Sequence, residues 1–130
     1  MVITKEISRD VLENVFVTAI EGGSNYWYCL SNEAVKVIRS VLSKTEEPFM
    51  SIAVLKAVLD YGISIPISDA DNENDIVGFI SRDTMQERLQ KLSEDDSCRW
   101  ALEAEIDGHG DADSSDVVFQ YITMGEYIFG

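Results

Sequence analysis

Apolar residues recur at helical spacing near the start of the chain. After Ser8 they follow one another at intervals of three and four residues, the period of an amphipathic helix, and Gly22 with Gly23 ends the pattern. A serine hydroxyl in this place can cap the first turn of a helix. The sequence therefore predicts a helix that begins at Ser8 and buries Val11, Leu12, Val15, Phe16, Ala19 and Ile20.

Two further stretches, 32–42 and 51–61, have the same period and are separated by Pro48. We expect a helix in each. Residues 25–30 contain three consecutive aromatic side chains without a helical period, which is typical of an extended segment packed beneath the first helix.

The period changes to two after Gly62. Ile63, Ile65 and Ile67 alternate with polar residues or proline, which predicts a short strand. Because Pro66 has no N–H to donate, we expect this strand at the edge of the sheet. The acidic run 69–75 should then form a loop or turn before a second strand at 76–79.

The last third of the chain is again helical in pattern. Ser81 should cap a helix that places Met85, Leu89 and Leu92 inward and exposes the opposite face, which comprises Glu87, Arg88, Gln90 and Lys91. A short helix over 98–105, a glycine-containing turn at 107–110, a helix over 113–124 and an apolar tail at 127–130 follow. The sequence predicts one domain, 1–130, of the α+β class, mainly helical with a two- or three-stranded sheet.

The composition is that of an ordinary globular protein, with 45% hydrophobic residues, 26% charged residues and a mean hydropathy of -0.04. No apolar run approaches the roughly 20 residues that a membrane span needs. Cys29 and Cys98 lie far apart, and the N-terminus lacks the pattern of a signal peptide. We therefore expect reduced thiols and a cytoplasmic protein.

The net charge is the property in which this chain differs most from an average globular protein. The formal net charge is -14, and the residues after Tyr61 hold 16 of the 24 acids but 4 of the 10 bases. This balance argues against direct binding to nucleic-acid phosphates or to anionic membranes. If the acids share one face, they would attract a basic partner and could occupy the positions of phosphates before its arginines and lysines. The alternative is that they only keep the protein soluble.

Metal binding and catalysis find little support. Residues 69–76 begin like an EF-hand loop, but Asn74 stands where glycine is needed and Ile80 where the bidentate glutamate should be. His109 with Asp107, Asp111 and Asp113 could form a metal cluster, yet Asp111 and Asp113 have a sufficient role at the start of the last helix. With one histidine and no nucleophile or phosphate-loop motif, we expect no enzyme activity, no metal and no cofactor.

Two stretches at the ends of the chain look familiar: TAIEGGSNYW at 18–27 and DADSSDVVFQYITMGEYIFG at 111–130. Together with GISIPISDADNE at 62–73, they resemble a widespread group of small acidic proteins encoded by phages and prophages. The resemblance brings no catalytic residues and implies a phage setting. Small non-enzymatic phage proteins of this kind often occupy a binding surface of a host protein or capture a host signalling molecule.

The leading hypothesis is a phage-encoded inhibitor in the host cytosol that binds a basic, nucleic-acid-binding host defence protein, such as an RNA-guided nuclease, as a phosphate mimic. The expected contacts are Asp69, Asp71, Glu73, Asp75, Glu94, Asp95, Asp96, Glu103 and Glu105.

Two alternatives remain open. One is a receptor or sponge for a nucleotide signal that uses Ser24, Asn25, Tyr26 and Trp27, with a basic pocket drawn from Arg9, Lys36, Arg39 or Lys56. The other interpretation of this segment, which we favour, is the end of a helix followed by aromatic residues of the core. The other alternative is a structural or housekeeping phage protein that forms a homo-oligomer. Its interface would use the exposed aromatics Trp27, Trp100, Tyr127 and Phe129.

Overall fold

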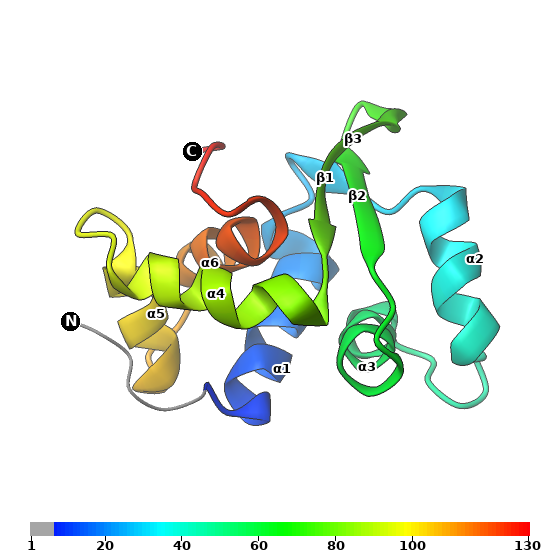
Figure 1. Cartoon of the computed structure of the whole chain (residues 1–130), viewed down its shortest axis with the longest axis horizontal. Coiled ribbons are helices and arrows are strands. Elements are labelled where there is room, and N and C mark those ends of the chain that lie inside the picture. The colour runs from blue at the N-terminus through cyan, green and yellow to red at the C-terminus, as the bar shows by residue number, and fades with distance from the viewer. Residues whose placement is uncertain (1–6) are drawn as a thin grey trace.

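Helices and strands follow one another in the order that the periodicity predicts (Figure 1). The computed structural model describes residues 7–130, and over that range six α-helices accompany a three-stranded antiparallel sheet. The helices are α1 (Arg9–Thr18), α2 (Asn32–Val41), α3 (Met50–Tyr61), α4 (Arg82–Ser93), α5 (Arg99–Ile106) and α6 (Ala112–Met124). The strands are β1 (Tyr28–Cys29), β2 (Ile65–Asp69) and β3 (Asn72–Ile80). The mainly helical α+β class is confirmed. Within residues 7–130, none of the helices combines the length and apolarity needed to cross a bilayer.

The helix ends follow the capping rules. The Ser8 hydroxyl accepts from the Val11 N–H at 3.3 Å and begins α1, as predicted. At its other end, α1 runs into a π-helical segment, η1 (Ala19–Gly23). Asp111 and Ser114 cap α6 reciprocally, so Asp111 has the helix-opening role that the sequence indicates.

The sheet differs from the prediction in the place of β2. Its order is β1-β2-β3, so β2 is the central strand and not an edge. Pro66 is tolerated because the two-residue β1 pairs only with Ser68 and Asp69, which leaves Pro66 with a strand partner, Phe79, on the β3 side alone.

The turn expected in the acidic run 69–75 is present but shorter than the run. Ala70 and Asp71 form a two-residue turn, and β3 already begins at Asn72. Asp69 pairs with Asn72 and Ser68 with Ile76, so residues 73–75 are additional to the ladder and form a bulge. The hairpin projects from the molecule (Figure 1). We call Asp69–Asp75, the turn and this bulge, the acidic hairpin.

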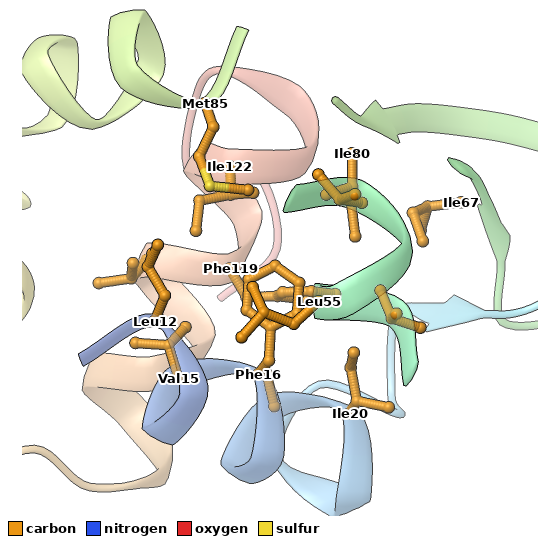
Figure 2. Close-up of a cluster of buried hydrophobic side chains, with 14 of the residues drawn as sticks. Leu12, Val15, Phe16, Ile20, Leu55, Ile67, Ile80, Met85, Phe119 and Ile122 are labelled. Atoms are coloured by element: carbon orange, nitrogen blue, oxygen red, sulfur yellow. The ribbon is translucent and has the colours of Figure 1, made fainter. Parts of the chain in front are cut away.

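The hydrophobic core lies where α1, α3 and α6 meet the sheet (Figure 2). Phe16 of α1 and Phe119 of α6 are fully buried and pack edge to face, with ring centroids 5.7 Å apart. Helix α6 also contacts α4, α5 and β3, and all residues from Ser114 to Thr123 are buried. This stretch includes five polar side chains. Those of Ser114, Ser115, Asp116 and Gln120 hydrogen-bond to other protein groups, whereas the Thr123 hydroxyl has no hydrogen-bond partner among residues 7–130.

One residue of the face of α4 that we expected to be exposed is in fact structural. Arg88 is half-buried, and its Nη1 donates to the carbonyls of Ile122 and Thr123 at 2.8 and 2.7 Å and to that of Phe79 at 3.0 Å. The guanidinium therefore satisfies the last carbonyls of α6 and ties them to β3. Gly78 allows this approach, since a Cβ there would lie 2.5 Å from the Thr123 carbonyl oxygen.

Candidate functional site

A buried carboxylate joins the two ends of the chain. Asp116, which is 6% exposed, accepts from the Ser24 hydroxyl at 2.7 Å and the Trp27 indole N–H at 2.8 Å through Oδ1. Its Oδ2 accepts from the Tyr26 hydroxyl and, at 3.1 Å, from the Gln120 amide. An ionised carboxylate has about four acceptor positions, so these four donors satisfy it without a cation.

The amide of Gln120 fixes the C-terminal tail in the same region. Gln120 is fully buried; its Oε1 accepts from the N–H groups of Ile128 and Phe129 at 3.0 and 2.9 Å, and its Nε2 donates to the Phe129 carbonyl at 2.8 Å. The Phe129 ring stacks on Trp27 with a centroid distance of 5.5 Å and an interplanar angle of 13°. The stretches 18–27 and 111–130 are therefore one interlocked unit.

The hydrogen bonds of Asp116 and the burial of the aromatic rings place most of the aromatic segment in the core. Trp27 and Tyr28 are 3% and 4% exposed, which confirms that core aromatics follow the helix stop. Ser24 is fully buried, and its hydroxyl is used by Asp116, as is the Trp27 indole. A nucleotide could reach the donors of Ser24 and Trp27 only by breaking these bonds, although Asn25 and Tyr26 are exposed. Burial of Trp27 also removes it from the aromatics proposed for an oligomer interface, where our expectation of exposure was wrong.

The basic residues suggested for a nucleotide pocket are already engaged. Arg9 of α1 pairs with Asp60 of α3 through two bonds of 2.8 Å. Lys56 pairs with Glu47 at 2.8 Å, and Arg39 donates to the carbonyls of Leu42 and Glu47. Lys36 lies 3.7 Å from Glu33. Three of the four cations are thus paired with acids, and the Arg39 guanidinium is bonded to backbone carbonyls.

Two of the acids expected to contact a partner have structural roles instead. Glu105 is 8% exposed and accepts from the hydroxyls of Ser114 and Ser115, so its placement at the surface was wrong. Asp95 accepts from the Tyr121 hydroxyl and from the Ser97 N–H at 2.9 Å. The Tyr121 bond is the main reason why the pKa of Asp95 lies below its usual value, and burial, followed by this bond, raises the pKa of Tyr121.

The other seven acids of the predicted set divide into separate groups. Asp71, Glu73 and Asp75 are exposed on the acidic hairpin, where Asp69 is half-buried. Glu94 and Asp96 are exposed in the connection between α4 and α5, and Glu103 is half-buried on α5. Figure 1 shows the tip of the acidic hairpin well apart from the α4–α5 connection. The acids therefore do not gather into one continuous patch.

Potential metal ligands are scattered as well. Across the part of the chain that the structure describes, residues 7–130, no three His, Cys, Asp or Glu side chains are grouped so that they could hold a metal ion. Cys29 and Cys98 are free thiols.

Comparison of the chain with protein-family models, with curated proteins and with solved structures finds no match.

Proposed function

We propose that the protein is a non-enzymatic binding protein that uses its acidic hairpin to occupy the basic, nucleic-acid-binding surface of another protein. One observation carries this proposal: three exposed carboxylates, Asp71, Glu73 and Asp75, lie within five residues of a hairpin that projects from the domain. Among residues 7–130, none of these three side chains forms an ion pair. Their charge is therefore available to a partner.

The rest of β3 adds apolar area beside these charges. Ile76 and Phe79 are 51% and 48% exposed, although both are large hydrophobic residues on a strand. An apolar patch rimmed by charged groups is typical of protein interfaces, where burial supplies affinity and complementary charge supplies orientation and association rate. The bulge at residues 73–75 interrupts the regular ladder of β3, which works against edge-to-edge pairing with another strand. This favours side-chain contacts with a partner.

The resemblance to small acidic phage proteins supports the setting of the proposal. A phage protein of this kind would act in the cytosol of the host, and a host defence protein that binds nucleic acid, such as an RNA-guided nuclease, offers the arginine- and lysine-lined cleft that carboxylates can enter. The nucleotide-receptor alternative has lost its main donors to Asp116, and no contact favours it.

The test is capture from host lysate on the tagged protein across a series of salt concentrations. The variant Asp71→Asn/Glu73→Gln/Asp75→Asn removes three charges from the acidic hairpin. A matched control, Asp10→Asn/Glu21→Gln/Glu33→Gln, removes three exposed charges from the first half of the chain. We expect a basic, nucleic-acid-binding protein that is captured at low salt, is released as salt rises, and is lost with the hairpin variant but kept with the control.

Capture that is unchanged at high salt, or that the two triple variants weaken equally, would overturn the proposal. In the first case the contact would be mainly apolar, and in the second only the net charge of the protein would matter.

A further inference from the structure

A second surface feature has the chemistry of a cation site. A pocket of about 460 Å³, open to solvent, lies between α5, the start of α6, the segment after η1 and the C-terminal tail. Three aromatic rings line it: Tyr26, Trp100 and Tyr127, which are 56%, 49% and 42% exposed. Val117 and the carboxylates of Asp113 and Asp116 also line the pocket.

Exposed hydrophobic side chains that gather at one place, unlike those scattered singly, often mark an interaction or ligand site. The face of an aromatic ring carries negative potential and attracts cations, and several rings around one space form the cages that bind organic cations. Because the carboxylates line the same pocket, the rings and the acids both favour a positively charged ligand. The volume lies within the range of ligand-binding pockets.

The Tyr26 ring is held in place before any ligand arrives. Its hydroxyl donates to Asp116 and contacts the Phe129 carbonyl at 3.1 Å, while its ring remains exposed. Burial, with help from the Asp116 carboxylate, raises the pKa of Tyr26, so the hydroxyl stays protonated at physiological pH. A ring fixed in this way loses little conformational freedom on binding.

The two carboxylates have different roles. Both oxygens of Asp116 are occupied by donors from the protein, so Asp116 positions Tyr26. Asp113 is exposed in the first turn of α6, and its side chain makes no hydrogen bond or ion pair with residues 7–130. The N-terminus of α6 carries about half a positive charge, which the full charges of Asp111 and Asp113 exceed. A cation is therefore not repelled there.

We propose that this pocket binds the guanidinium group of an arginine side chain of the basic partner. Arginine fits better than lysine because its planar group stacks on aromatic faces while its fork of N–H groups pairs with a carboxylate such as that of Asp113. The source of the arginine rests on the proposed function, but the pocket itself is separate from the acidic hairpin and can be tested with a free ligand.

The test is a titration of the ¹⁵N-labelled protein with N-acetyl-arginine amide, followed through the indole N–H signals of its two tryptophans. N-acetyl-citrulline amide, which has nearly the same shape without the charge, serves as the comparison ligand. We expect a saturable shift of the Trp100 signal with the arginine derivative, little response to the citrulline derivative, and a Trp27 signal that moves far less because that ring is buried.

Trp100→Ala, followed through the backbone signal of Asp113, and Asp113→Asn should each weaken binding about two- to fivefold. Asp107→Asn is the matched control, since it removes one exposed charge from the α5–α6 connection at a residue that does not line the pocket. It should leave the affinity unchanged. An equal response to both ligands, no saturable shift, or an equal loss with Asp107→Asn would overturn the cation pocket.

This outcome is distinguishable from failure of the proposed function. If the hairpin proposal is wrong, no salt-sensitive partner is captured, yet the titration with the arginine derivative still succeeds. If the pocket is wrong, the titration fails while capture through the acidic hairpin persists.

Discussion

Replacing Asp116 by alanine should destabilise the protein more than replacing any exposed acid. The carboxylate is the acceptor for three buried side chains, Ser24, Trp27 and Gln120, and for the partly exposed Tyr26. A buried donor that loses its acceptor costs about 1–3 kcal/mol. Three such donors, with some rescue by water from the Tyr26 side, give an expected loss of about 3–5 kcal/mol in the free energy of unfolding.

Urea unfolding followed by circular dichroism measures this loss. Asp113→Ala, three residues earlier on α6 but exposed, is the control and should cost less than about 0.5 kcal/mol. The pair Asp116→Ala and Trp27→Phe forms a double-mutant cycle, because Trp27→Phe removes one donor and should reduce the cost of losing the carboxylate. A loss below about 1 kcal/mol for Asp116→Ala, or strict additivity in the cycle, would contradict the reasoning.

Three further variants test the contacts around α6. Arg88→Met keeps the aliphatic stem but leaves the last carbonyls of α6 without their donor, and it should lower the free energy of unfolding by about 2 kcal/mol in the same assay. Gly78→Ala should prevent β3 from approaching the end of α6 and lower the melting temperature, whereas Gly22→Ala, where a Cβ meets nothing within 4 Å, should leave it nearly unchanged; equal effects would contradict the close approach. Tyr121→Phe removes the main cause of the lowered pKa of Asp95, so an NMR titration should show that pKa rising toward its ordinary value of 3.8. Since a lowered pKa contributes stability that is present above the ordinary value and is lost as pH falls through the lowered one, the acid-induced loss of stability should be smaller in Tyr121→Phe; an unchanged pKa would show that the bond is absent in solution.

Local patterns accounted for most of the secondary structure. The apolar spacing after Ser8 and the alternation after Gly62 depend only on neighbours in the sequence, and the helix and strand follow them. The edge position expected from Pro66 was wrong, because a proline needs only one free side at its own position, and β1 is too short to reach it. A proline in one strand does not indicate how long the neighbouring strand is.

Local sequence patterns could not predict the hydrogen-bonded unit formed by residues 18–27 and 111–130. Ser24 and Asp116 are 92 positions apart, and nothing near either residue indicates its partner. One signal was available: the helix after Asp111 has serines, aspartates and a glutamine among apolar residues, which can indicate buried polar groups in need of partners. The same stretch explains why Glu105 was misplaced, since the hydroxyls of Ser114 and Ser115 bring it inside.

The most direct test of the proposed function asks whether the protein and a nucleic acid exclude each other on the captured partner. The partner is held at a fixed concentration with labelled oligonucleotide, and the protein is added at low salt while the bound oligonucleotide is measured. The account predicts complete displacement by the wild-type protein and by the first-half control, and a much weaker effect of Asp71→Asn/Glu73→Gln/Asp75→Asn. Formation of a ternary complex, with protein and oligonucleotide bound together, would contradict it.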